Sequence, residues 1–146
     1  MHVPQPCPPE LVDSWLRLAA TVEDLFGPMP DLRRHVHKAI TRGTAQVVIK
    51  DDTVVGGMLL SGPSKPQYIH WLAVHPAFRG QGVGSALLEA ALAHWPSGEI
   101  AVVTFPASRV GGQAARYLYQ RHGFISQGAT DPAPDGSPRE LFVLTR

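Results

Sequence analysis

The sequence predicts a mixed α/β fold, in which helices pack on a central sheet containing both parallel and antiparallel strands. One observation is a change of period near residue 44, where apolar residues at helical spacing give way to short β-rich runs. The other is the strand–helix–strand order of residues 70–105, which is typical of a parallel strand pair. The length of 146 residues and the 44% hydrophobic content suit a single domain spanning residues 1–146.

Two helices are expected before the first long strand. The first runs from Pro9 to about residue 26, because apolar residues recur there at helical spacing and a proline favours the first turn. Gly27 and Pro28 end it. The second covers residues 30–42 and is closed by Gly43. The residues before Pro9 are rich in proline and are expected to be extended.

The remaining elements form the sheet and two further helices, so that about four helices flank it. Asp51 and Asp52 predict a hairpin turn between the first two long strands. The Val83–Trp95 segment has a clear apolar stripe at helical spacing. The expected strands are 44–50, 53–62, 67–74, 99–105, 123–127 and 139–145, and the expected later helices are 83–95 and 111–121.

Composition excludes several classes of function. A net charge of +1 offers no basic surface for a nucleic-acid backbone, so we expect no nucleic-acid partner. Cys7 is the only cysteine, which excludes an intramolecular disulfide and favours a reducing compartment. No apolar run has the length of a membrane span, and the N-terminus lacks the pattern of a signal peptide. We therefore expect a cytoplasmic protein without a membrane partner. No H-E-x-x-H or C-x-x-C spacing occurs, so no metal is expected.

A glycine-rich loop precedes the helix at residue 83. The stretch Arg79-Gly80-Gln81-Gly82-Val83-Gly84 places an arginine and three glycines between a strand and a helix. Unpaired N–H groups and the dipole at a helix N-terminus favour an anion, and arginine suits phosphate. The loop therefore indicates a phosphate site; the alternative is a tight turn whose glycines serve geometry alone.

Two familiar phosphate loops do not fit this stretch. A mononucleotide loop needs a lysine and then Ser or Thr after its last glycine, whereas Ser85 follows Gly84 directly. The dinucleotide fingerprint needs the spacing G-x-G-x-x-G, and the next strand ends in Thr104-Phe105 instead of an acidic residue. Phosphoryl transfer to or from a nucleotide is therefore disfavoured.

The pattern R-x-x-G-x-G after a strand ending in V-x-P resembles the acetyl-coenzyme A loop of the GNAT superfamily of N-acyltransferases. A second motif, Tyr119-Gln120-Arg121-His122-Gly123-Phe124, is similar to the Y-x-x-x-G-F of that family. The resemblance covers about residues 44–127, and the segment IHWLAVHPAFRGQGVG also resembles the arylalkylamine N-acetyltransferases. Two departures are visible. The family's first strand is expected to be missing or vestigial, and Gly111-Gly112 replaces an asparagine that often precedes the second motif.

The resemblance implies a GNAT fold, a direct transfer of an acetyl group from acetyl-CoA to an amine in a ternary complex, and a monomer or homodimer. It implies that Tyr119 protonates the departing thiolate; the alternative for this tyrosine is core packing. Residues implied to bind the cofactor through the pantetheine arm, the pyrophosphate or the groups beside it are Leu72, Ala73, Val74, Arg79, Gly80, Gln81, Gly82, Val83, Gly84 and Ser85.

The general base is assigned to His70, which lies where some arylalkylamine enzymes carry histidine and whose ordinary pKa near 6.5 suits proton acceptance. Strand alternation predicts that Tyr68, His70 and Leu72 share one face. A structural role for His70, or a water relay positioned by Tyr68, is the alternative.

The acceptor amine is expected between the first helices and the last strands. The carboxylates there are candidates for attracting a cationic amine, or are simply solvated loop charges: Glu23, Asp24, Asp131 and Asp135. The alternative to an N-acetyltransferase of small amines or protein amino groups is a non-catalytic module that binds acyl-CoA as a sensor or scaffold.

Overall fold

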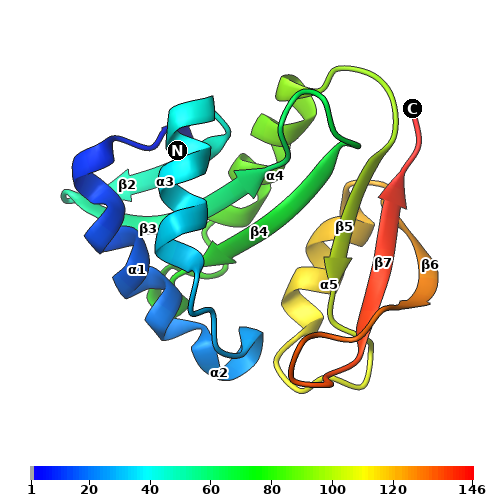
Figure 1. Ribbon diagram of the computed structural model, residues 1–146. Coiled ribbons are helices and arrows are strands. Elements are labelled where there is room, and N and C mark those ends of the chain that lie inside the picture. The colour runs from blue at the N-terminus through cyan, green and yellow to red at the C-terminus, as the bar shows by residue number, and fades with distance from the viewer. Residues whose placement is uncertain (1) are drawn as a thin grey trace.

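The structure is a computed structural model that describes residues 2–146. Its strands form one mixed sheet in the order β1-β2-β3-β4-β5-β7-β6, which confirms the predicted mixed α/β fold (Figure 1). The strands are β1 (Gln5–Pro6), β2 (Ala45–Lys50), β3 (Thr53–Leu60), β4 (Tyr68–Val74), β5 (Ile100–Thr104), β6 (Ile125–Thr130) and β7 (Arg139–Leu144). The helices are α1 (Val12–Thr21), α2 (Glu23–Phe26), α3 (Leu32–Arg42), α4 (Val83–His94) and α5 (Gln113–Arg121), with short 3-10 turns at Pro9–Leu11 and Pro76–Phe78.

The first half of the sheet follows the predicted hairpins. Asp51 and Asp52 have φ angles of 51° and 58°, as a two-residue turn between twisted strands requires, so the predicted hairpin is confirmed. The first strand, expected to be missing or vestigial, is the two-residue β1, which pairs with β2.

Several element boundaries differ from the prediction by one to three residues, and the first helix and β6 also differ in their course. The first helix is interrupted at Val22, whose φ of −115° leaves the helical region and separates α1 from α2. Strand β6 continues to Thr130, three residues beyond the predicted end at residue 127. Its pairing with β7 is irregular in register between Ser126 and Gly128.

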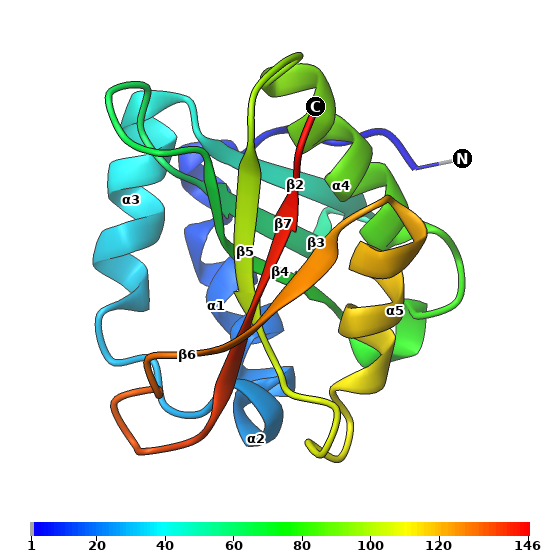
Figure 2. The same cartoon turned by 90° about the vertical axis from the view of Figure 1, so that its right-hand side faces the viewer.

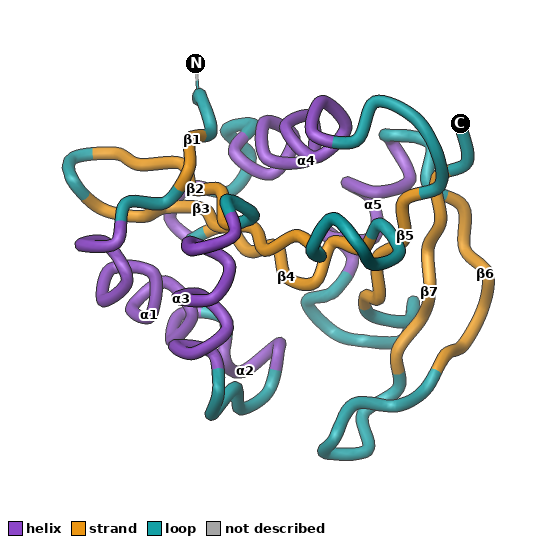
Figure 3. Tube along the Cα trace, turned by 45° about the horizontal axis from the view of Figure 1, so that its top comes forward, coloured by secondary structure: helices purple, strands orange, loops and turns teal. Residues whose placement is uncertain are grey.

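Two apolar cores lie on the two faces of the sheet. One joins α1 and α3 to the sheet around Trp15, and the other joins α4 and α5 to it around Leu87 and Phe142. Figure 3 shows α1, α2 and α3 on one side of β2, β3 and β4 with α4 on the other, and Figure 2 shows α3 to the left of β5 and β7, and α4 and α5 to their right. The helices therefore hold the sheet from both sides.

The sheet divides between β4 and β5. These parallel strands share only the pairs Tyr68–Ala101 and Ile69–Val102, after which they separate toward their C-terminal ends (Figure 1). The register of β4 against β3 also shifts at this level: Leu60 pairs with Ile69 and Leu59 with Trp71, so His70 is the additional residue of a bulge.

This bulge corrects the prediction that Tyr68, His70 and Leu72 share one face. His70 stacks on Tyr68, with ring centroids 6.0 Å apart. Leu72, in contrast, packs with the core of α4 and α5. Strict alternation fails because the extra residue changes the phase of the strand.

Arg116 of α5 connects the end of β5 to β7. Its Nη1 donates to the carbonyl oxygen of Phe105 at 2.9 Å and lies 3.0 Å from Oε1 of Glu140 in β7. The two charged side chains are only 15% and 16% exposed. A hydrogen bond from Ser126 and then the Arg116 guanidinium hold the pKa of Glu140 below its ordinary 4.5.

Replacing Arg116 with leucine is expected to lower the free energy of unfolding by about 2–4 kcal/mol, because Glu140 is left without its cation. Urea unfolding at neutral pH measures this loss.

The ionised carboxylate of Glu140 contributes stability above its ordinary pKa, and this contribution is lost as the pH falls through the lowered pKa of the folded state. The cost should therefore shrink below about pH 4.5, and the double variant R116L/E140L should recover part of it. A cost that is independent of pH would contradict this account.

Candidate functional site

The glycine loop forms the N-terminus of α4. Gly80 and Gly82 have φ angles of 75° and 85°, which is the left-handed region where a side chain is strained, although there is open space around both. Gly84 suits its position for a different reason. A Cβ there would lie 3.1 Å from Leu118 of α5, so the glycine lets the two helices approach closely.

The backbone of this loop presents unpaired donors. The first intrahelical bond runs from the N–H of Ala86 to the carbonyl of Gly82, so the N–H groups of residues 83–85 have no partner within α4. Together with the positive end of the helix dipole, they can bind an anion.

A cavity of about 390 Å³ begins at this loop and runs between α4, α5 and the end of β4. Every predicted cofactor residue lines it except Gln81, which is exposed outside it: Leu72, Ala73, Val74, Arg79, Gly80, Gly82, Val83, Gly84 and Ser85. No carboxylate belongs to the described residues around this cavity. Its electrostatics therefore favour an anionic ligand.

Arg121 is a second cation at the loop, and sequence reasoning missed its role. Its Nη2 donates to Oγ of Ser85 at 2.7 Å, and its guanidinium carbon lies 5.3 Å from the centroid of the Tyr117 ring. All three side chains line the cavity. The available signal was the helical spacing of residues 117 and 121, which places them on one face of α5.

A second cavity, of about 270 Å³, lies where β4 and β5 separate. It is lined by both predicted catalytic residues, His70 and Tyr119, and by Arg139 of β7. The two cavities share four lining residues, which mark where they meet: Phe26, Leu72, Phe105 and Ala115.

Phe26 spans the division of the sheet. Its ring centroid lies 5.6 Å from that of Trp71 in β4 and 5.5 Å from that of Phe105, which directly follows β5. The ring therefore fills space between the separated strands. Sequence reasoning treated this residue only as the end of a helix, because the contact depends on a tertiary arrangement.

Tyr119 is buried among Phe124 and Phe142, and burial raises the pKa of its hydroxyl far above the ordinary 10.0. The hydroxyl is therefore protonated at neutral pH. The hydroxyl has no hydrogen-bond partner in the described part of the chain. Among those residues, Trp15 Nε1 is the only side-chain polar atom that is both fully enclosed and without a partner, so the Tyr119 hydroxyl is not fully enclosed. The phenol oxygen thus keeps access to the cavity and can donate a proton into it.

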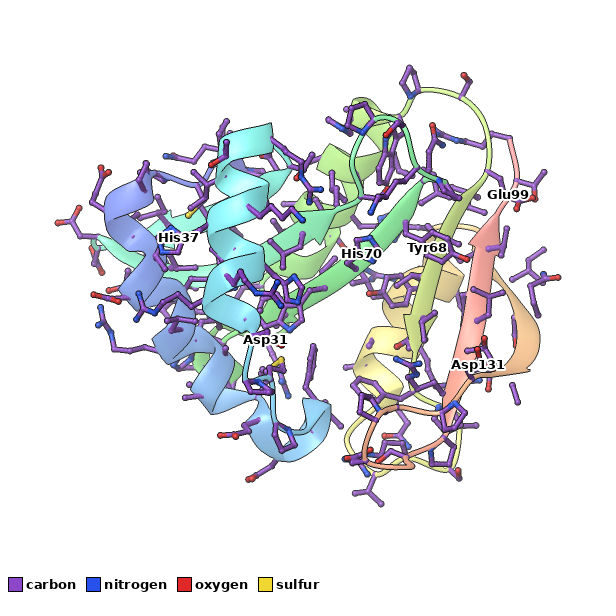
Figure 4. The ribbon with its side chains drawn as sticks, viewed as in Figure 1. Asp31, His37, Tyr68, His70, Glu99 and Asp131 are labelled. Atoms are coloured by element: carbon purple, nitrogen blue, oxygen red, sulfur yellow. The ribbon has the colours of Figure 1, made fainter. Side chains whose placement is uncertain are left out.

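His70 lies on the α3 side of β4, as Figure 4 shows, and its side chain is exposed at the second cavity. Partial removal from water, followed by the positive charges of Lys65, Arg42 and His35, lowers its pKa below 6.5. The imidazole is therefore neutral at pH 7 and can accept a proton.

The carboxylates predicted for an amine site do not line this cavity. Glu23, Asp24, Asp131 and Asp135 are all outside the set of lining residues. Figure 4 shows Asp131 well separated from His70. The lining favours the alternative that they are solvated loop charges, because the loop after β6 presents Ala133 and Pro134 to the cavity.

Residues 2–146 offer neither a metal site nor a membrane-spanning helix. Within residues 2–146, no group of three or more His, Cys, Asp or Glu side chains is arranged to hold a metal ion. None of the helices in the same residues combines the length and apolar character needed to cross a bilayer.

Sequence comparison identifies the family. The sequence model described as an acetyltransferase (GNAT) domain matches residues 41–126, which is more than half of the chain. The chain belongs to the GNAT acetyltransferase family. The protein is therefore an acyltransferase, as the two motifs predicted. A comparison with curated proteins found no match.

Solved structures of GNAT proteins share this fold at low sequence identity. A GNAT acetyltransferase from Bacillus cereus is 20% identical with a TM-score of 0.80, and the alignment covers 100% of this chain and 98% of that one. Ard1 from Thermoplasma volcanium is 22% identical with a TM-score of 0.79, covering 97% and 95%. PaiA N-acetyltransferase from Thermoplasma acidophilum, solved in complex with coenzyme A, is 14% identical with a TM-score of 0.73, covering 100% and 99%.

Proposed function

We propose that this GNAT protein transfers an acetyl group from acetyl-CoA to a primary amine by direct attack in a ternary complex. The observation that carries the proposal is the meeting of two different cavities at the division of the sheet. One offers cations and free N–H groups, and the other offers a proton donor and a proton acceptor. Such a pair of cavities suits two substrates that react where they meet.

In this proposal the first cavity binds the cosubstrate. The N–H groups of residues 80–85 and Arg79 hold the pyrophosphate, with Arg121 and Ser85 beside it. The edge of β4 that faces β5 has no strand partner beyond Ile69, so the backbone of Leu72, Ala73 and Val74 is free to bind the pantetheine arm. The PaiA protein was solved in complex with coenzyme A, which supports a CoA thioester as the cosubstrate. Acetyl-CoA supplies an activated acetyl group as a thioester.

The second cavity holds the acceptor and the catalytic groups. The neutral amine nitrogen forms a bond to the acetyl carbon, and His70 accepts the proton that this nitrogen loses as the bond forms. As the carbon–sulfur bond breaks, Tyr119 donates its proton to the departing thiolate. Each proton therefore has a donor and an acceptor, and both groups have the required protonation state at neutral pH.

Replacing Tyr119 with phenylalanine is expected to lower kcat by about 100-fold or more, because the thiolate loses its proton donor. Thiol release from acetyl-CoA in the presence of an amine panel measures this. Since the hydroxyl has no hydrogen-bond partner within the described residues, the free energy of unfolding should change by less than about 0.5 kcal/mol.

Full activity in this variant would remove the assignment of Tyr119 as the acid. Binding of acetyl-CoA without turnover of any amine would instead favour the non-catalytic sensor or scaffold.

The pH dependence tests His70. Turnover, corrected for the fraction of neutral amine, should rise with pH through a pKa below the ordinary 6.5 and be level by pH 7, because only the neutral imidazole accepts a proton. In His70→Gln this rise should disappear and the level should fall by about 100-fold. His35→Gln, which alters a neighbouring histidine outside the cavity, serves as the control. A pH profile of His70→Gln that retains the rise would assign the base to another group.

A further inference from the structure

Arg139 is the only Lys or Arg among the described residues that line the second cavity. Its Nε donates to the carbonyl oxygen of Asp131 at 2.9 Å, and its Nη2 donates to that of Pro132 at 3.0 Å. These partners are neutral. Among residues 2–146, the ion pairs involve Arg33, Arg34 and Arg116, so no carboxylate forms an ion pair with Arg139.

The two carbonyl bonds leave donors of the guanidinium free. Arginine has five N–H groups in a planar fork, and this fork matches a carboxylate or phosphate. The bonds to the loop also restrict the side chain, which reduces the entropy lost when it binds an anion.

Other charges at this cavity have the same sign. Lys65, Arg42 and His35 act on His70 from outside the lining, and no carboxylate of residues 2–146 lines the cavity. Asp135 is the nearest acid in sequence to the lining residues 133 and 134, but its Oδ1 accepts from the N–H of Ser137 and its Oδ2 is directed at Gly27. A simple cationic amine therefore finds no counterion here.

We propose that the acceptor is a small amine that also carries a carboxylate or phosphate, with the acid group bound by Arg139 and the amine facing His70. The cavity of about 270 Å³ suits a small molecule. This inference rests on the proposed acetyl transfer and specifies its acceptor. Positive charge at the cavity attracts the acid group and orients the amine.

The test compares matched amines that differ in the acid group. The pairs are phenylalanine with phenethylamine, leucine with isopentylamine, and phosphoethanolamine with ethanolamine, each with saturating acetyl-CoA. The value of kcat/KM is expressed per neutral amine. We expect the wild-type protein to prefer the acid-bearing member of the carboxylate pairs, the phosphate pair or both by about 10- to 100-fold, the range of a charge-assisted hydrogen bond.

Arg139→Gln should bring this preference close to one, while Arg139→Lys should keep part of it. Arg109→Gln is the matched control, because Arg109 also donates to two backbone carbonyls but lines neither cavity. It should leave the preference unchanged.

Preference for the amines without an acid group would overturn the inference while leaving acetyl transfer intact, and this result needs only the wild-type protein. An unchanged preference in Arg139→Gln would overturn the role of Arg139. If no amine is turned over and none shifts the melting temperature of the CoA-loaded protein, both proposals fail.

Discussion

The structure of the site depends on the limited pairing between β4 and β5. Two residue pairs connect them, and the bulge at His70 follows immediately. From this level the strands separate, so backbone groups of β4 lose a strand partner and space opens on both sides of the sheet. Phe26 occupies part of that space, and Arg116 holds the end of β5 to β7. The separation is therefore a stable feature that is held by aromatic packing and by a largely buried ion pair.

The two cavities differ in the charges and proton-transfer groups that they present. The first is positive because of two arginines and a helix N-terminus, which suits a phosphate-rich cosubstrate. In the second, burial keeps Tyr119 protonated, while the surroundings of His70 keep it neutral. A proton donor and a proton acceptor thus face one space at neutral pH. Removal from water is the largest cause of both pKa shifts, because it disfavours the charged form of each group, and at His70 the nearby cations lower the pKa further.

Much of the fold and part of the site could be predicted from sequence, because local patterns specify them. The turn at Asp51 and the loop at Gly82 follow from residues adjacent in the chain. The roles of Phe26, Arg121 and Arg139 could not be predicted in this way, since each depends on contacts between elements far apart in sequence. The bulge at β4 was missed because an extra residue in a strand leaves the apolar pattern almost unchanged.

The most direct test of the account is whether the first cavity binds acetyl-CoA. Thermal unfolding would be followed with and without acetyl-CoA, and with ATP and NAD as controls. At 100 times its Kd, a ligand of the folded state adds about 2.7 kcal/mol to the free energy of unfolding, so acetyl-CoA should raise the melting temperature clearly and selectively. An unchanged melting temperature with acetyl-CoA, or an equal rise with ATP, would contradict the assignment of the glycine loop and its cavity.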